Sequence, residues 1–109
     1  MEFRPVTEDF AVAPQIEASD VAGIKAAGFK SLVCNRPDTE MGAVAHDGIA
    51  DAARAAGLEF RFIPVVSGSI TQQNVADMKE ALSSLPRPVL AYCRTGGRCM
   101  NLFMLVQQA

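Results

Sequence analysis

The stretch PVLAYCRTGGRCM, residues 88–100, indicates how this chain folds. Its first half, residues 88–93, is a short apolar run of the kind that forms a buried strand. Gly96 and Gly97 then allow the backbone to curl tightly, because glycine tolerates positive φ. The residues that follow, about 98–109, are apolar on nearly every side and predict a buried helix. A strand, a glycine turn and a helix form the repeating unit of α/β sheets, so the same alternation is expected upstream.

Strand-like and helix-like segments do alternate along the rest of the chain. The expected strands are residues 10–13, 30–35, 59–66 and 88–93, with residues 3–6 as a candidate partner for the first. The expected helices are residues 19–28, 45–57, a segment capped by Thr71 that ends before residue 85, and 98–109. This order predicts an α/β fold with a mostly parallel central sheet flanked by helices. A length of 109 residues fits a single domain over residues 1–109.

Composition excludes several classes of function. The formal net charge of −2 argues against a general nucleic-acid-binding protein, which would carry a basic face. No apolar run approaches the roughly 18–20 residues that span a membrane, and no signal peptide precedes the first strand, so we expect a cytoplasmic protein. Three cysteines without a CxxC pair, together with one histidine, predict free thiols and neither a structural metal site nor a bound cofactor.

Three loops follow the carboxyl ends of the expected strands, where ligand sites of open α/β sheets lie. These loops are residues 35–42, 66–72 and 93–98. The topology therefore predicts that polar side chains from the first two loops gather around Cys93; they are Arg36, Asp38, Glu40 and Ser67.

The loop that begins at Cys93 has the composition of an anion site. Successive backbone N–H groups of residues 94–98 would point inward if Gly96 and Gly97 curl the chain, and the following helix adds its positive N-terminal dipole. Arg98 can close this nest, with Arg94 and Thr95 alongside. The same groups favour a thiolate, so the pKa of Cys93 should be lowered. The alternative is a plain turn with a buried strand cysteine, which a lone cysteine before two glycines would suggest.

A family resemblance rests on four stretches: FAVAPQ (10–15), GFKSLVCNRPDTE (28–40), FIPV (62–65) and YCRTGGR (92–98). They resemble the beta-lactamase hydrolase-like, phosphatase-like domain family, and the second half of the chain resembles dual-specificity-type cysteine phosphatases. The resemblance implies a cysteine-phosphatase-like fold and a small anionic substrate such as a phosphate ester. It further implies that Cys93 is the nucleophile and that Arg98 binds the anion.

Three features depart from the phosphatase pattern. Only four residues separate Cys93 from Arg98, one fewer than usual, and Tyr92 stands where phosphatases usually carry histidine. The acid loop has no carboxylate at residues 66–68, although a phosphatase needs an acid to protonate the leaving oxygen. Asp38 or Glu40 could supply that acid from the neighbouring loop, or these residues could simply brace it.

Two other functions therefore stay open beside cysteine-based phosphate hydrolysis. A six-residue loop also resembles that of rhodanese-type sulfurtransferases, in which the Cys93 thiolate would accept a sulfane sulfur as a persulfide. Sulfur transfer needs no general acid, because a leaving group such as sulfite is already a stable anion. A non-catalytic module that binds an anion or a partner would also explain the altered acid loop.

The remaining cysteines and the last helix carry two further hypotheses. Cys34 or Cys99 could trap an oxidised Cys93 as a reversible disulfide, with a buried apolar role as the alternative for Cys34. Cys99 stands where phosphatases carry a serine or threonine that helps the nucleophile leave as a thiolate. The apolar helix at 98–109 predicts an exposed strip that pairs in a homodimer.

Overall fold

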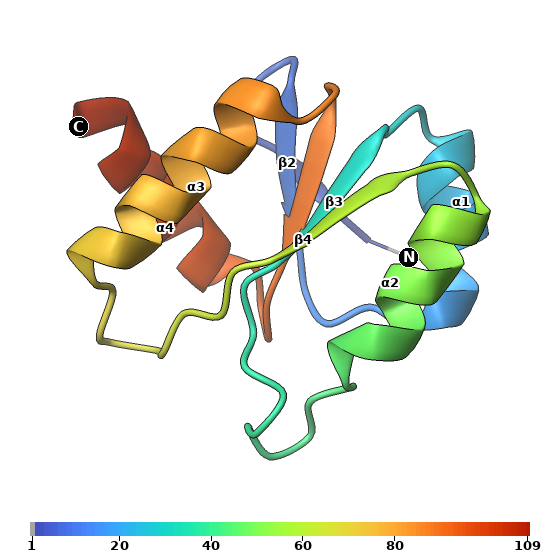
Figure 1. Cartoon of the computed structure of the whole chain (residues 1–109), viewed down its shortest axis with the longest axis horizontal. Helices are drawn as coiled ribbons and strands as arrows, with labels where there is room; N and C mark the ends of the chain where they lie inside the picture. Colours follow the sequence, from blue (N-terminus) through green and yellow to red (C-terminus); the bar gives the residue numbers. More distant parts are fainter. Residues whose placement is uncertain (1) are drawn as a thin grey trace.

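In the structure, a computed structural model, the short apolar segments of the chain form strands and the amphipathic segments between them form helices. Together they make an α/β fold (Figure 1). It describes residues 2–109. The strands are β1 (Arg4–Pro5), β2 (Phe10–Ala13), β3 (Ser31–Cys34), β4 (Glu59–Phe62) and β5 (Val89–Tyr92). The helices are the 3₁₀ turn η1 (Ala18–Asp20), α1 (Val21–Ala26), α2 (His46–Ala55), α3 (Gln72–Ser84) and α4 (Gly97–Gln108).

The sheet has the strand order β1-β2-β5-β3-β4. Strands β2, β5, β3 and β4 run parallel, and the short β1 pairs antiparallel with β2 at the edge. Along one row across the sheet, Val12 pairs with Ala91, and Ala91 pairs with Val33. The prediction of a mostly parallel sheet is confirmed, and residues near 3–6 do supply the partner of the first long strand.

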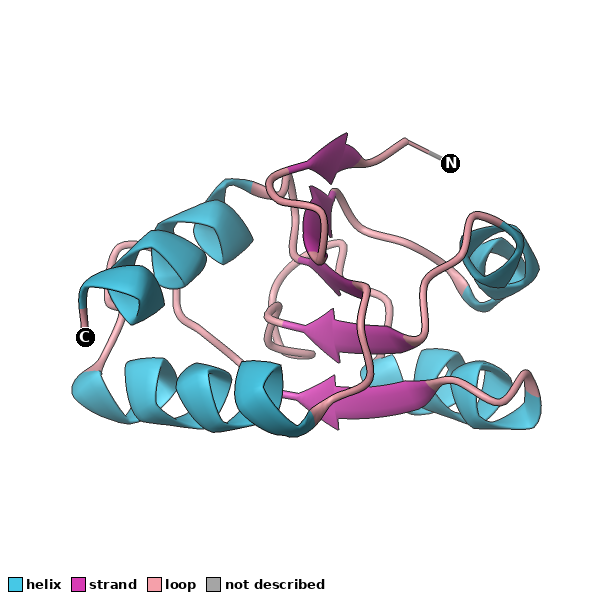
Figure 2. Cartoon of the chain, turned by 90° about the horizontal axis from the view of Figure 1, so that it is seen from above, coloured by secondary structure: helices cyan, strands magenta, loops and turns pink. Residues whose placement is uncertain are grey.

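Helices cover both faces of the sheet, with α3 and α4 on one side and α1 and α2 on the other (Figures 1 and 2). Alternate residues of each strand point to opposite faces, so the strands contribute to two separate apolar clusters. Val12, Val33 and Ala91 pack with Met78 of α3 and Leu102 of α4. Their neighbours in the strands pack against α1 and α2; among them are Ala11, Leu32, Leu90 and Tyr92.

Most elements agree with their predicted bounds to within one or two residues, and two differ in a way that has a physical cause. Strand β4 ends at Phe62 and does not continue to residue 66, because Pro64 has no N–H with which to extend the ladder. The segment beyond stays beside β3 nonetheless: the N–H of Ile63 bonds to the carbonyl oxygen of Cys34 at 2.9 Å, and that of Val65 to Asn35 at 2.9 Å. The expected helix at 19–28 begins as the turn η1, closed by the Asp20 carboxylate on the N–H of Glu17, and becomes α-helical only at Val21.

The carboxyl ends of β3, β4 and β5 meet at one edge of the sheet, since these strands are parallel neighbours. Three connections leave from that edge, and they carry most of the side chains described next. Among the helices of residues 2–109, none has both the length and the apolar character needed to cross a membrane.

Candidate functional site

The loop between β5 and α4 wraps around the sulfur of Cys93. Cys93 follows the last residue of β5, and α4 begins at Gly97 after Gly96 has turned the chain with a φ of 94°. The N–H of Gly96 donates to Cys93 Sγ at 3.1 Å, and the backbone N–H groups of Thr95 and Cys99 also hydrogen bond to this sulfur. The sulfur therefore lies inside a ring of donors at the N-terminus of a twelve-residue helix.

These donors make Cys93 acidic. The thiol of Cys99 hydrogen bonds to it, and with the surrounding backbone N–H groups it lowers the pKa of Cys93 from 9.0 to about 5, against the opposing effect of burial. Burial and the adjacent Cys93 raise the pKa of Cys99 well above its ordinary value, so Cys99 remains a thiol that donates. Cys93 is therefore a thiolate at neutral pH.

Arg98 is held in one position beside this sulfur. Its Nη1 donates to Glu40 Oε2 at 2.7 Å and to the carbonyl oxygen of Val65 at 2.8 Å, and its Nη2 donates to Glu40 Oε1 at 3.2 Å. The side chain is only 9% exposed. This bidentate ion pair orients the guanidinium, which is a planar donor well suited to phosphate oxygens.

Glu40 in turn is fixed by a second arginine. Arg36 is buried; its Nε donates to Glu40 Oε1 at 3.0 Å, and its other nitrogens donate to Gln15 Oε1 at 3.0 Å and to the Met41 carbonyl oxygen at 2.7 Å. Hydrogen bonds from Arg98 first, then from Arg36, lower the pKa of Glu40. Glu40 is thus an ionised acceptor, and Arg36 braces the loop that carries it.

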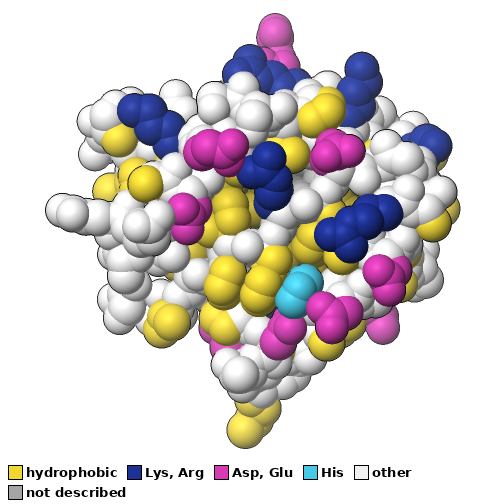
Figure 3. Space-filling model, viewed as in Figure 1, with side chains coloured by type: hydrophobic (Ala, Val, Ile, Leu, Met, Phe, Trp, Pro, Cys, Tyr) yellow, Lys and Arg dark blue, Asp and Glu magenta, His cyan; other side chains and the backbone are white. Residues whose placement is uncertain are grey.

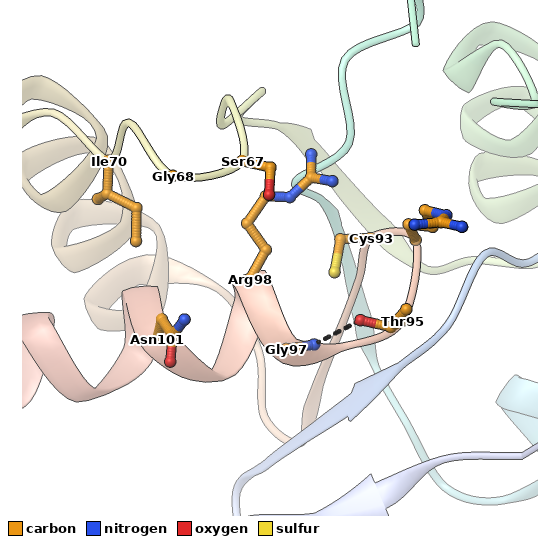
Figure 4. Close-up of a pocket in the computed structure, with 9 residues that line it drawn as sticks. Ser67, Gly68, Ile70, Cys93, Thr95, Gly97, Arg98 and Asn101 are labelled. Carbon is orange, nitrogen blue, oxygen red and sulfur yellow. Dashed lines mark hydrogen bonds between the residues drawn. The ribbon is translucent and has the colours of Figure 1, made fainter. Parts of the chain in front are cut away.

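A cavity of about 510 Å³ opens above the sulfur and extends along α4 (Figure 4). Cys93 and Arg98 lie at one end of the cavity. Further along α4 lie the side chain of Asn101, which belongs to this helix, and that of Ile70, which comes from the loop before α3. The lining residues are Ser67, Gly68, Ile70, Cys93, Arg94, Thr95, Gly97, Arg98 and Asn101. This volume falls within the range of small-molecule sites.

Sequence reasoning placed Ser67, Cys93, Arg94, Thr95, Gly97 and Arg98 at this site, and all six line the cavity. Gly96, also named, is not among the lining residues and turns the loop with its positive φ. Sequence reasoning missed Gly68, Ile70 and Asn101. Asn101 had a usable signal, because it follows Arg98 by three residues on a helix and therefore shares its face.

Asp38 lies elsewhere. It is not among the residues that line the cavity; its Oδ1 accepts from the N–H of His46 at 2.9 Å and its Oδ2 lies 2.7 Å from His46 Nδ1. The imidazole stacks on Phe62 at 3.7 Å and also approaches Asp47, and Figure 3 shows the histidine in cyan beside acidic side chains on the surface. Asp38 thus caps the start of α2, and the geometry does not support the expectation that it is the acid.

The two other cysteines occupy opposite sides of the sheet. Cys99 packs with Cys93 in the cluster under α3 and α4, whereas Cys34 packs in the cluster under α1 and α2. Cys34 Sγ lies 3.4 Å from the carbonyl oxygen of Arg36, and burial raises the pKa of its thiol. This arrangement favours Cys99 over Cys34 as a disulfide partner of Cys93.

Comparison with known sequences gives one consistent result. Residues 2–109 match the family described as beta-lactamase hydrolase-like protein, phosphatase-like domain. A beta-lactamase hydrolase-like protein of Agrobacterium fabrum is 33% identical over 101 residues, which are 92% of this chain and 23% of that protein. One from Xylella fastidiosa Temecula1 is 29% identical over 106 residues, 96% of this chain and 25% of that protein. The chain therefore spans about a quarter of the length of these curated relatives.

Solved structures resemble the fold. A protein of Neisseria meningitidis proposed to be a phosphatase is 32% identical with a TM-score of 0.82, over 92% of this chain and 72% of the other. The core catalytic domain of the PP-IP phosphatase SIW14 from S. cerevisiae has a TM-score of 0.75 at 14% identity, over 97% of this chain and 64% of that one. The second likeness concerns the fold alone, which is that of cysteine phosphatases.

Proposed function

Because the chain belongs to the beta-lactamase hydrolase-like protein, phosphatase-like domain family, we propose that it hydrolyses a small phosphorylated substrate through the Cys93 thiolate. One observation carries the proposal: a cysteine with a pKa of about 5 lies at the end of a cavity beside an arginine held ready for an anion. Family membership supports a phosphatase-like domain; the assignment of the nucleophile rests on this geometry.

The reaction would proceed in two displacements. The Cys93 thiolate attacks phosphorus, a sulfur–phosphorus bond forms, and the bond to the leaving oxygen breaks with its electron pair on that oxygen. Water then attacks the phosphocysteine, the sulfur–phosphorus bond breaks, the thiolate returns and a proton passes to solvent. Arg98 and the backbone N–H groups of the loop bind the phosphoryl oxygens throughout, where charge develops in the transition state.

Cys99 and Glu40 act on this centre through other groups. The Cys99 thiol hydrogen bonds to Cys93 and so stabilises the thiolate when it leaves phosphorus. Glu40 holds Arg98 in its bidentate pair, which keeps the guanidinium oriented before substrate arrives. We assign both as positioning residues.

Sulfur transfer is the second candidate, because it needs no general acid and the cavity-lining residues within 2–109 include no carboxylate. Ser67, Gly68, Ile70 and Asn101 surround the path of a departing group, and a leaving sulfite would need no proton from them. Cys93 would take the sulfane sulfur as a persulfide and pass it to a second thiophilic acceptor. The family and the structural neighbours are described as phosphatases, so this candidate comes second.

One paired assay tests these proposals. Hydrolysis of p-nitrophenyl phosphate and sulfur transfer from thiosulfate to cyanide are measured on the parent protein, on Cys93→Ser and on Cys34→Ala, a matched control on the other face of the sheet. We expect hydrolysis that is lost in Cys93→Ser and retained in Cys34→Ala. Hydrolysis that survives Cys93→Ser would contradict the mechanism. Sulfur transfer alone would establish the second candidate, and phosphate binding without turnover would indicate a non-catalytic anion-binding module.

A further inference from the structure

The ionised state of Glu40 bears on which substrates this site can process. Glu40 is the carboxylate bound to Arg98, which lines the cavity, and both of its oxygens accept hydrogen bonds. Oε1 accepts from Arg36 at 3.0 Å and from Arg98 at 3.2 Å, and Oε2 accepts from Arg98 at 2.7 Å. Two guanidinium groups keep this carboxylate deprotonated, so it has no proton to give to a leaving oxygen.

The residues that line the cavity offer no acid to a leaving group. Beyond Cys93 and Arg98 they are Ser67, Gly68, Ile70, Thr95, Gly97, Asn101 and the exposed Arg94, which adds a second positive charge. A hydroxyl and a primary amide can donate hydrogen bonds, but their protons are far too weakly acidic to be transferred near neutral pH. Within residues 2–109, none of the cavity-lining side chains is a carboxylic acid, and Asp38 is engaged by His46.

We infer that the substrate carries its phosphoryl group on a leaving group that departs as a stable anion without protonation. This inference rests on the proposed phosphatase function and names its substrate class: aryl phosphates, acyl phosphates or phosphoanhydrides, as opposed to phosphate esters of alkyl alcohols. The electron pair of the broken phosphorus–oxygen bond stays on the leaving oxygen, and hydrogen bonds from Asn101 and Ser67 stabilise that charge. The cavity of about 510 Å³ is large enough to hold such a group beside the phosphoryl site.

A series of phosphate monoesters tests the inference on the parent protein. The series runs from p-nitrophenyl phosphate through less activated aryl phosphates to an alkyl phosphate, and kcat/KM is measured with the Cys93→Ser rate subtracted. General acids contribute about 10²- to 10⁴-fold, so we expect the alkyl ester to be slower than the nitrophenyl ester by at least about 10²-fold. Alkyl and aryl rates within about tenfold of each other would overturn the inference.

Variants at the two carboxylates provide a second readout. In Glu40→Gln, looser orientation of Arg98 should lower kcat/KM by the same factor for every ester in the series, whereas Glu59→Gln, on the exposed start of β4, should change none. Any effect of Asp38→Asn should likewise be shared by all esters. A loss confined to the poor leaving groups in either variant would identify that residue as a general acid and overturn the inference.

The two proposals fail in different ways. A flat dependence on the leaving group, with hydrolysis still lost in Cys93→Ser, overturns the inferred substrate class and leaves cysteine-based hydrolysis standing. A series in which no ester, the nitrophenyl ester included, is hydrolysed in a Cys93-dependent manner overturns the proposed function and the inference with it.

Discussion

At the scale of single residues, the proposed chemistry depends on the pair formed by Cys93 and Cys99. A cysteine at position 99, where a hydroxyl residue is usual, first suggests a weaker donor to the nucleophile. In the structure Cys99 is buried, and its thiol, which keeps its proton, acts together with the backbone N–H groups of the loop to lower the pKa of Cys93. The weak donor is thus compensated by its position.

The pH dependence of Cys93 alkylation tests this pair. Since the pKa of Cys93 is lowered to about 5, its reactivity with iodoacetamide should rise as pH increases through about 5 and level off above. Cys99→Ala removes the thiol donor and should move this rise to higher pH, so that alkylation at pH 6 becomes slower than in the parent protein. Cys99→Ser keeps a donor and should preserve the low midpoint. Peptide mapping assigns the label, and equal midpoints in all three proteins would contradict the assignment.

At the scale of elements, the junction of β5 and α4 decides where the donors point. Gly96 adopts a φ of 94°, and a Cβ built there would lie 2.9 Å from Arg4 Nη2. Gly97 is already helical, and its Cβ would lie 3.5 Å from Thr95 Oγ1, which is ordinary contact. Adjacent glycines therefore have different tasks: one turns the chain, and the other only begins the helix.

Substituting the two glycines separately should distinguish these tasks. Gly96→Ala forces an L-residue into left-handed backbone and should lower the free energy of unfolding by about 1–2 kcal/mol. It should also raise the pKa of Cys93, because the N–H of residue 96 is displaced from the sulfur. Gly97→Ala should leave stability unchanged or raise it by up to about 1 kcal/mol. Urea unfolding measures the stability of each variant. Equal free energies of unfolding for Gly96→Ala and Gly97→Ala would contradict the different roles assigned to the two glycines.

At the scale of the whole molecule, one sheet separates two apolar clusters. Leu102 is fully buried in the cluster under α3 and α4, and Ile49 is fully buried in the cluster under α1 and α2. On the outer side of α4, Met104 and Leu105 are 53% and 41% exposed. These two side chains agree with the expected exposed strip, and the homodimer stays a prediction. Both clusters share the same strands, so they should unfold together.

Truncations in the two clusters test this coupling. Leu102→Ala and Ile49→Ala should each lower the free energy of unfolding by about 2–5 kcal/mol, whereas Leu105→Ala on the exposed side should cost less than about 1 kcal/mol. The single tyrosine, Tyr92, lies in the central strand of a chain without tryptophan and reports on the sheet. Its fluorescence and far-UV circular dichroism should give coincident transitions in every variant. Separate transitions would show that the two clusters unfold independently.

Local pattern was sufficient to identify most elements and to select the loop that borders the cavity. Alternation of apolar runs with amphipathic segments predicted the parallel sheet, and the composition of residues 93–98 predicted the anion loop. The end of β4 was misplaced because the apolar run passes Pro64, where the ladder stops although the chain stays extended. Ile70 was missed because an apolar residue in the loop before α3 gives no sign of a ligand site, whereas Asn101 could have been found from its spacing to Arg98 on α4.

The order of residues alone was enough to establish an α/β chain and to place Cys93 in a glycine turn at the end of a strand, because periodicity, glycine turns and helix starts are local properties. Packing decided the roles of the carboxylates. Glu40 and Asp38 are two residues apart in one loop, yet Glu40 turns inward to Arg98 and Arg36 and Asp38 turns outward to His46. Each carboxylate is engaged by the donors within its reach: Arg98 of α4 and Arg36 of the same loop for Glu40, and His46 of α2 for Asp38. Only the packing of these elements around the sheet determines that Glu40 is the carboxylate that contacts Arg98. The same packing lowers the pKa of Glu40, so it is ionised there.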